Sequence, residues 1–200
     1  MIMVSLLMLL SACSLSPKMS PAMHSVQVEV SAKQRVDLPQ PKALQQTINV
    51  SQLITAQWSD ESKQTLLVQL QVNPQKVVLA GFSAWGVKLL SLTYWGHDVG
   101  NKIETNVITG FGNTLPPAEQ ILFNVMLAIW PKSSWDKPLA NIAWTLKENN
   151  LQRLLFDEHG ELIVSIDYQK KPYLEGKIIF KHHPLDYTII IETKRMKNNE

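Results

Sequence analysis

The residue types that could carry out catalysis do not form a catalytic arrangement in this 200-residue sequence. Ser83 lies in the segment Gly81-Phe82-Ser83-Ala84-Trp85, but Trp85 stands where the sharp turn of a serine nucleophile requires glycine. Asp157 and Glu158 could form an acid pair, but they fall in an expected hairpin turn. The histidines lack the spacing of a zinc site; they are His24, His97, His159, His182 and His183. We therefore expect no enzyme activity, no cofactor and no metal.

The single cysteine, Cys13, has the sequence context for a different chemistry, acylation of its thiol. It follows the apolar stretch Met1–Leu10 and the small residues Ser11 and Ala12, which is typical of the cleavage site of a lipoprotein signal peptide. All four positions of Leu10-Ser11-Ala12-Cys13 match the bacterial lipobox. That resemblance implies cleavage before Cys13, a lipid on its thiol and attachment to a membrane. The alternative is a buried amino-terminal strand with an ordinary core cysteine.

The position after the cysteine and the residues that follow predict where the protein goes. In sorting rules of the enterobacterial kind, Ser14 directs a lipoprotein to the outer membrane, where it faces the periplasm. The polar, proline-containing stretch 14–41 indicates a tether. We therefore predict a signal peptide over 1–12, a lipidated amino terminus and tether over 13–43, and one folded domain over 44–196.

The charge of the chain argues against nucleic acid as a partner. The formal net charge is only +2, and the 19 basic residues form no stripe.

Hydrophobic periodicity in the body is mainly that of β-strands. Leu66, Val68, Leu70 and Val72 alternate with polar residues, which predicts a strand over 65–72. Further strands are expected over the ranges 76–82, 88–95, 151–156, 161–168, 176–181 and 187–193, with a short one possible over 26–30. A hairpin loop is expected at Asp157-Glu158-His159-Gly160.

One helix is expected between Pro117 and Pro131. Its residues are apolar nearly all round, and Glu119 is its only charge. Such a helix is buried or covers an apolar cavity.

The order of these segments resembles that of a family of uncharacterised bacterial outer-membrane lipoproteins whose genes often accompany those for aryl polyene lipid synthesis. The landmarks are Leu66–Leu70, Gly81–Leu92, Leu127–Pro131, Arg153–Phe156 and Tyr187–Thr193. More remotely, the body is similar to LolB, the receptor that accepts lipoproteins from a periplasmic carrier. That resemblance implies a mainly β fold, a single curved antiparallel sheet forming a half-barrel, with lid helices on its concave face.

The resemblance to LolB also implies functional residues. Trp85-Gly86 occupies the place of a loop that helps to deliver cargo to the membrane; the alternative is that Trp85 folds back onto the sheet. The apolar strand and lid faces are expected to line a cavity for acyl chains; the alternative is a dry, filled core. The expected cavity residues are Leu66, Val68, Leu70, Leu90, Leu92, Leu122, Met126, Ile129, Leu162, Val164 and Ile166.

Two functions are consistent with the sequence. The first is an outer-membrane lipoprotein that binds or transfers a hydrophobic cargo, either lipoprotein acyl chains or an aryl polyene-type lipid, with a periplasmic carrier as a partner. The second is a non-transporting accessory lipoprotein that docks an envelope lipid synthesis or export machine. An open cavity of several hundred cubic ångströms would favour the first, and a closed core the second.

Overall fold

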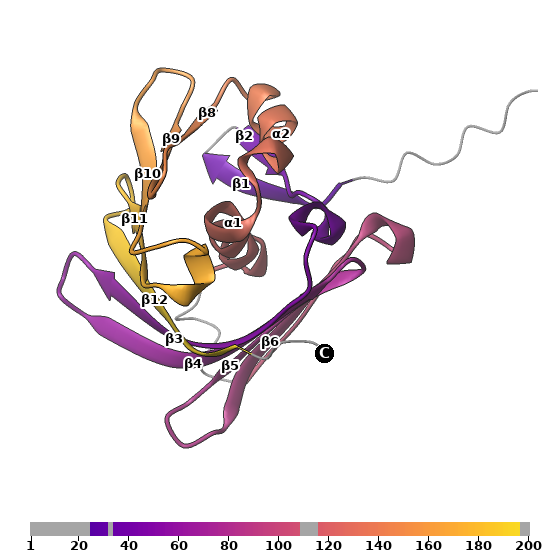
Figure 1. Ribbon diagram of the computed structural model, residues 1–200, viewed down its shortest axis with the longest axis vertical. Helices are drawn as coiled ribbons and strands as arrows, with labels where there is room; N and C mark the ends of the chain where they lie inside the picture. The colour runs from indigo at the N-terminus through magenta and orange to yellow at the C-terminus, as the bar shows by residue number, and fades with distance from the viewer. Residues whose placement is uncertain (1–24, 32–33, 109–115, 197–200) are drawn as a thin grey trace, which may run out of the picture.

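The protein is built on one strongly curved antiparallel sheet of ten strands. A computed structural model describes residues 25–31, 34–108 and 116–196. Hydrogen bonding gives the strand order β7-β6-β5-β4-β3-β12-β11-β10-β9-β8. Figure 1 shows the sheet curving around helix α1 (Ala118–Ile129), which lies on its concave side. The predicted fold class, a curved antiparallel sheet with helices on the concave face, is confirmed.

The ten strands fall into two runs of neighbours along the chain, and β12 joins them by pairing with β3. The first run comprises β3 (Ile48–Trp58), β4 (Lys63–Asn73), β5 (Lys76–Phe82), β6 (Lys88–Trp95) and β7 (Ile103–Val107). The second comprises β8 (Thr145–Glu148), β9 (Gln152–Phe156), β10 (Leu162–Tyr168), β11 (Ile178–His182) and β12 (Tyr187–Met196). Short helices occupy several connections: η1 (Pro41–Leu44), η2 (His97–Val99), η4 (Lys132–Ser134), α2 (Asp136–Ala140) and η5 (Tyr173–Glu175).

The alternation of apolar and polar side chains correctly predicted strands that bury one apolar face, such as β4. In β4, Val68, Leu70 and Val72 are buried while Gln69 and Gln71 are exposed, as the alternation predicts. The expected hairpin at 157–160 is also confirmed, because β9 and β10 pair antiparallel and Gly160 has a φ of 80°. This left-handed conformation is one that glycine adopts at little cost.

Strand β3 was not predicted as a separate element, although it lies at the centre of the sheet. Its inward face runs through Ile48, Val50, Gln52 and Ile54. The polar Gln52 interrupts the apolar alternation, and yet it is buried. Its amide is satisfied in the fold because Nε2 donates to Thr193 Oγ1 on β12 at 3.3 Å.

Helix α1 begins after Pro117 and ends before Pro131, as predicted. Every residue from Leu122 to Ile129 is buried. The helix is therefore enclosed by the concave face of the sheet and by the segments that cover it.

The folded body starts earlier than the sequence indicated. Strands β1 (Gln27–Ser31) and β2 (Gln34–Asp37) form a two-stranded hairpin within the segment expected to be a tether. Val28, Val36 and Leu38 are buried in the same hydrophobic core as α1. Figure 1 places this hairpin across the open side of the curved sheet, beside α1 and α2. The domain therefore includes residues from about Ser25, because these apolar side chains cover the helix.

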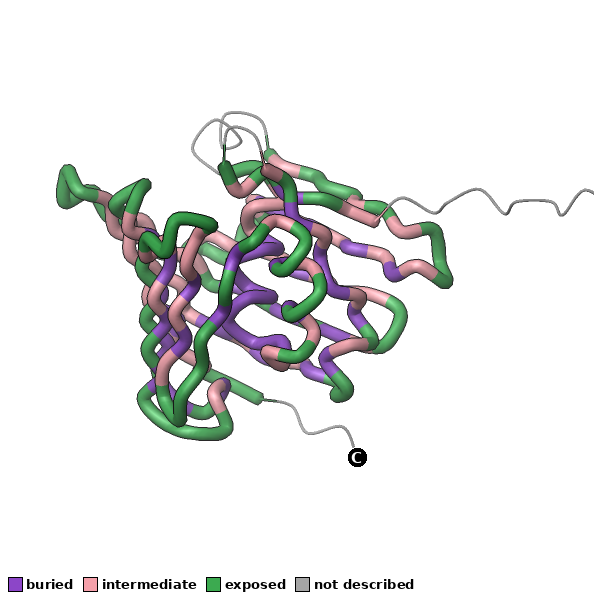
Figure 2. The backbone as a smooth tube through the Cα atoms, turned by 90° about the horizontal axis from the view of Figure 1, so that it is seen from above, coloured by how far each residue is buried: buried purple, intermediate pink, exposed green. Residues whose placement is uncertain are grey.

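Buried residues gather around α1, while the turns at the ends of the strands are exposed (Figure 2).

Cys13, Ser14 and His24 lie outside the described residues, so the predicted signal peptide and lipid anchor have no structural description. In the described part of the chain, no helix is both long and apolar enough to cross a membrane.

Candidate functional site

An apolar pocket of about 450 Å³ lies between the amino-terminal half of α1 and the concave face of the sheet. Its walls come from β3, β4, β5, β6, β11, β12 and the segment that enters α1. None of the described residues that line it is charged. They are Ile54, Ala56, Trp58, Gln64, Leu66, Val68, Leu79, Leu90, Pro116, Pro117, Gln120, Ile121, Asn124, Val125, Phe180, Leu185, Tyr187, Ile189 and Ile191.

Strand register explains how residues far apart in sequence form one wall of the pocket. Cross-strand pairing aligns Ile189 with Ala56 and Ala56 with Gln64. The next inward row pairs Ile191 with Ile54 and Ile54 with Leu66. Inward side chains on neighbouring strands stack in rows because side chains alternate between the two faces.

The size of one side chain helps to explain why space is left in this wall. Ala56 lies between the larger inward residues Ile54 and Trp58 on β3. Because the alanine side chain is a single methyl group, its row leaves a gap that the neighbouring isoleucines do not fill. The pocket lies at this gap, at the end of the sheet where β3 turns into β4.

The expected cavity residues separate into three groups in the structure. Leu66, Val68 and Leu90 line the apolar pocket. Ile129 lines a different cavity, at the opposite end of the sheet. Six of the remaining seven are buried elsewhere in the packed interior: Leu70, Leu92, Leu122, Met126, Val164 and Ile166. The seventh, Leu162, is half-buried and lies at a register shift in the pairing of β10 with β9.

The helix presents a different stripe to the pocket from the one expected. The pocket is lined by Gln120, Ile121, Asn124 and Val125. Leu122 and Met126, on the neighbouring stripe, are fully buried. Periodicity placed both stripes on an apolar helix, but only packing against the sheet decides which one meets an open space.

Several pocket residues were missed although their pattern was visible. Tyr187, Ile189 and Ile191 alternate on one predicted strand face. Ile54, Ala56 and Trp58 continue the alternation of β3 beyond Gln52. These two series pair directly in the sheet, which could have been inferred only by knowing that β12 pairs with β3.

The mouth of the pocket carries exposed apolar side chains. Among its lining residues, Pro116 and Pro117 are exposed and Leu185 is 61% exposed. Since neighbouring strands are antiparallel, the β3–β4, β5–β6 and β11–β12 turns all lie at this end of the sheet. The β5–β6 turn, at the same end of the sheet, carries two further exposed apolar residues outside the pocket lining, Trp85, which is 92% exposed, and Val87.

The turn that carries Trp85 is held in place by Ser83. The Ser83 hydroxyl accepts hydrogen bonds from the backbone N–H groups of Trp85 at 3.3 Å and Val87 at 3.2 Å. Gly86 takes a φ of 78°, which a side chain would disfavour. The turn therefore projects the Trp85 ring into solvent, and the ring does not fold back onto the sheet.

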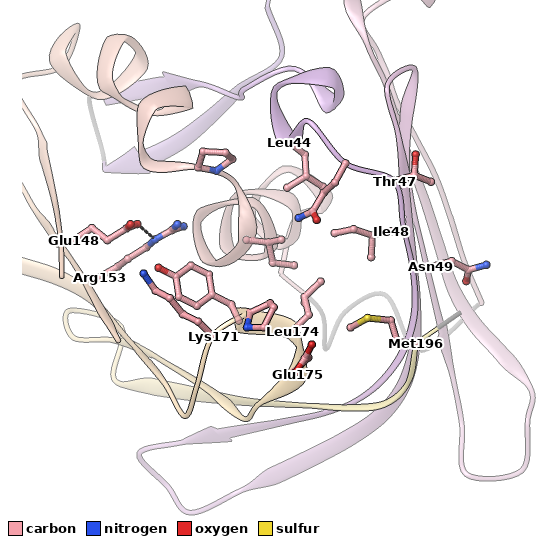
Figure 3. Close-up of a pocket in the computed structure, with 15 residues that line it drawn as sticks. Leu44, Thr47, Ile48, Asn49, Glu148, Arg153, Lys171, Leu174, Glu175 and Met196 are labelled. Atoms are coloured by element: carbon pink, nitrogen blue, oxygen red, sulfur yellow. Dashed lines mark hydrogen bonds and ion pairs between the residues drawn. The ribbon is translucent and has the colours of Figure 1, made fainter. Parts of the chain in front are cut away.

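A second cavity, of about 800 Å³, lies at the opposite end of the sheet. Figure 3 shows its lining residues, which include Glu148, Arg153, Lys171 and Glu175. Acidic and basic side chains are mixed in this cavity, and Arg153 is already paired with Glu148 at 2.5 Å. Because charged side chains share its lining with apolar ones, this cavity suits an apolar ligand less well than the smaller, uncharged pocket does, and we assign the candidate site to that pocket.

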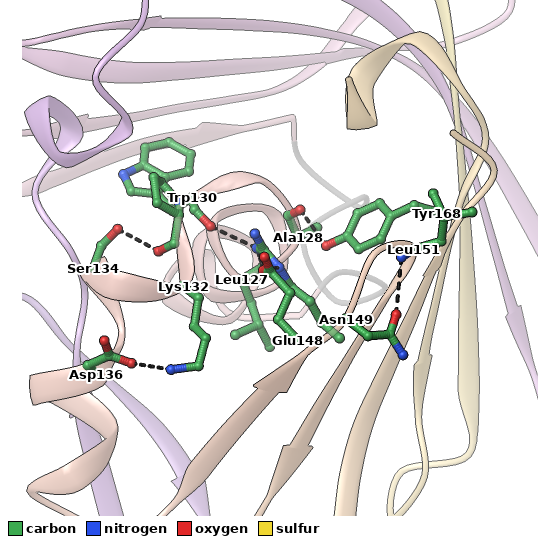
Figure 4. Close-up of polar contacts among 12 residues, drawn as sticks. Leu127, Ala128, Trp130, Lys132, Ser134, Asp136, Glu148, Asn149, Leu151 and Tyr168 are labelled. Carbon is green, nitrogen blue, oxygen red and sulfur yellow. Dashed lines mark hydrogen bonds and ion pairs between the residues drawn. The ribbon is translucent and has the colours of Figure 1, made fainter. Parts of the chain in front are cut away.

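The carboxyl end of α1 is fixed to the sheet by buried polar contacts. Arg153, which is 2% exposed, donates through Nη1 to the carbonyl oxygens of Leu127 and Trp130, both at 2.7 Å. The Tyr168 hydroxyl donates to the Ala128 carbonyl at 2.7 Å, as Figure 4 shows. These contacts satisfy carbonyls that the last turn of a helix leaves without partners. The helix is thus anchored at one end while its other end borders the pocket.

A buried histidine lies beside the pocket. His182 stacks against the ring of Tyr187, with ring centroids 5.1 Å apart, and its Nδ1 accepts the backbone N–H of Leu185. Burial, with a smaller contribution from His183, lowers the pKa of His182 to about 4. His182 is therefore neutral at pH 7. In the described residues, no cluster of three or more His, Cys, Asp or Glu could hold a metal ion.

Comparison with known proteins gives one family match and a set of distant structural likenesses. The model of a family described as "Protein of unknown function (DUF3261)" matches residues 49–195. No curated protein matches the sequence.

Two solved structures are similar to this chain in the path of the backbone. A domain from Vibrio parahaemolyticus that is described as belonging to an inferred outer membrane lipoprotein-sorting protein has a TM-score of 0.44 and 9% sequence identity. The likeness covers 78% of this chain and 88% of that one. A LolA superfamily protein from Nitrosomonas europaea has a TM-score of 0.44 and 7% identity, over 82% of this chain and 94% of that one.

Proposed function

Since the chain belongs to the DUF3261 family, whose description names no activity, we propose a function from the pocket itself. The protein binds one acyl chain of a lipid or lipoprotein between α1 and the concave face of the sheet. The observation that carries this proposal is an uncharged, apolar pocket of about 450 Å³ that opens at the end of the sheet.

The size and lining of the pocket support a small hydrophobic ligand. Ligand sites commonly measure about 300–1,000 Å³ and combine apolar walls with a few polar groups. Each methylene group that leaves water contributes roughly 0.8 kcal/mol, so a short run of methylenes suffices for measurable affinity.

The pocket favours cargo binding over the accessory function. A protein that only docks a larger machine has no need for an open apolar space, and filling that space would stabilise its core. Here the amino-terminal half of α1 leaves the space open, although its other half is tightly packed.

The proposal includes the anchor and the place of work. Cys13 carries the lipid, Ser14 directs the protein to the outer membrane, and the body faces the periplasm. The cargo is a lipoprotein acyl chain or an aryl polyene-type lipid, delivered by a periplasmic carrier. Trp85 and Leu185, which are exposed on turns at the same end of the sheet as the pocket, contact the membrane or the carrier during transfer.

A pocket-filling variant tests the binding function. We expect the purified protein to bind a fluorescently labelled fatty acyl ester, and Ala56→Trp to weaken that binding at least about tenfold by occupying the gap. Gln57→Trp is the matched control, because the adjacent residue points to the opposite face of β3. Fluorescence titration measures both affinities. A well-folded wild-type protein that fails to bind the ester would rule out the function.

A further inference from the structure

The wall of the apolar pocket contains a short chain of hydrogen-bonding side chains. Gln120, Asn124 and Tyr187 all line the pocket. Gln120 Nε2 donates to Asn124 Oδ1 at 3.1 Å, and Asn124 Nδ2 donates to the Tyr187 hydroxyl oxygen at 3.0 Å. Asn124 is only 7% exposed, so this polar chain is built into the buried lining of the pocket.

The two hydrogen bonds that link these side chains run in one direction, from Gln120 through Asn124 to Tyr187. Since the Tyr187 oxygen accepts from Asn124, its own proton is left to be donated. Over residues 25–31, 34–108 and 116–196, the Tyr187 hydroxyl makes no other hydrogen bond. A donor in an apolar pocket without an acceptor is unfavourable, so a ligand oxygen at this position would be stabilised.

The charge of the lining restricts the kind of oxygen. The described lining residues include no Lys, Arg or His that could neutralise a carboxylate. Moving an ionised carboxylate into an apolar site without a partner is strongly unfavourable. Burial raises the pKa of the Tyr187 hydroxyl, so Tyr187 remains a proton donor at neutral pH. A neutral carbonyl oxygen fits these conditions better than a charged group does.

We propose that the pocket recognises an acyl chain by its neutral carbonyl oxygen, which accepts a hydrogen bond from Tyr187. The ligand class is an ester- or amide-linked acyl chain, selected over free fatty acid and over plain hydrocarbon. Gln120 and Asn124 are positioning residues that orient the Tyr187 hydroxyl. This inference rests on the proposed function, since it presupposes that an acyl chain enters the pocket.

Competition for the fluorescent acyl ester probe by methyl laurate, laurate and an n-alkane of matched length tests the proposal. We expect the wild-type protein to bind methyl laurate about five- to tenfold more tightly than the alkane, as one added hydrogen bond allows. Laurate at pH 8 binds more weakly than methyl laurate. Tyr187→Phe removes the preference for the ester over the alkane and leaves the affinity for the alkane unchanged.

Tyr173→Phe is the matched control, because Tyr173 lines the second cavity, at the opposite end of the sheet. This variant keeps the wild-type preference. The proposal is overturned if wild type binds ester and alkane equally, if laurate binds more tightly than methyl laurate, or if folded Tyr187→Phe retains the preference. If the wild-type protein binds none of these lipids, the proposed function itself fails, and this inference fails with it.

Discussion

Trp85 is among the largest side chains in the protein, and the structure leaves it 92% exposed on a tight turn. A tryptophan ring in water is unfavourable, but the ring suits the boundary between lipid and water. Val87 on the same turn is also exposed, and Leu185 is exposed on the β11–β12 turn. The exposed apolar residues at this end of the sheet therefore form a surface suited to a membrane or an apolar partner.

Substitution of Trp85 should separate this surface role from stability. We expect Trp85→Ser to reduce binding of the unlipidated protein to phospholipid vesicles severalfold. The free energy of unfolding should change by less than about 0.5 kcal/mol, because the ring is almost wholly exposed. Vesicle sedimentation and urea denaturation measure the two quantities. Val99→Ser, an exposed apolar site at the other end of the sheet, should leave vesicle binding unchanged. Equal vesicle binding by Trp85→Ser and wild type would contradict the surface role.

His182 makes stability depend on pH. Because burial lowers its folded-state pKa from 6.5 to about 4, the unfolded chain binds a proton more readily between these values. The contribution of neutral His182 to the free energy of unfolding is therefore fully present above pH 6.5 and is lost as the pH falls toward 4. We expect the free energy of unfolding to fall by at most about 1.4 kcal/mol per pH unit in this window, because one group can bind at most one extra proton.

Urea denaturation between pH 4 and pH 8 measures this slope. His182→Gln keeps a group that can accept the Leu185 N–H but removes the titration, so its slope should be clearly smaller. A variant with the same slope as wild type would show that other groups cause the pH dependence.

At the scale of the element, α1 is a helix with two different halves. Its carboxyl half is buried and fixed by Arg153 and Tyr168, and its amino half borders an open pocket. A cation near the last carbonyls also interacts favourably with the helix dipole. This asymmetry allows the pocket to exist without loosening the helix.

Removing the arginine should release that anchor. We expect Arg153→Met to lower the free energy of unfolding by about 3 kcal/mol, since it leaves the carbonyls of Leu127 and Trp130 and the carboxylate of Glu148 without this partner. Lys147→Met, an exposed neighbour on β8, should change it by less than about 0.5 kcal/mol. Chemical denaturation of both variants provides the comparison. A loss below about 1 kcal/mol for Arg153→Met would mean that packing alone holds the helix.

At the scale of the whole molecule, the amino-terminal hairpin completes the core. It covers α1 from the side that the sheet leaves open. The backbone just after it is also fixed, because Trp130 Nε1 donates to the Gln40 carbonyl at 3.1 Å. The family match begins at residue 49, so this cover comes from residues that precede the matched region.

The hairpin segment should therefore contribute to global stability. We expect Leu38→Ala to lower the free energy of unfolding by about 2–3 kcal/mol, because a buried leucine is truncated. Arg35→Ala, on the exposed side of β2, should have little effect. A shift in the urea midpoint for Leu38→Ala but not for Arg35→Ala is the expected result. Equal midpoints would indicate that residues before η1 are not part of the cooperative unit.

The sequence by itself determined most of the strands and the buried helix. These features are local: alternation along β4 and β10 and the apolar surface of α1 depend only on neighbouring residues. Strand β3 escaped because Gln52 interrupts its pattern, and its hydrogen-bonding partner Thr193 lies 141 residues away. A short strand over 26–30 was considered and corresponds to β1, but the segment as a whole was assigned to a tether because the buried residues Val28, Val36 and Leu38 are surrounded by polar residues and prolines.

Only the tertiary structure decided where the pocket is and which residues line it. Three of the eleven expected residues, Leu66, Val68 and Leu90, lie there. The others are equally apolar and, apart from the half-buried Leu162, are buried in the packed interior or, as Ile129, beside the second cavity. The physical reason is that a pocket is a space between elements: it arises where β12 pairs with β3, where Ala56 leaves a row unfilled, and where one stripe of α1 faces that row. Residue type fixes what prefers to be buried, but register and helix orientation fix what the buried side chains face.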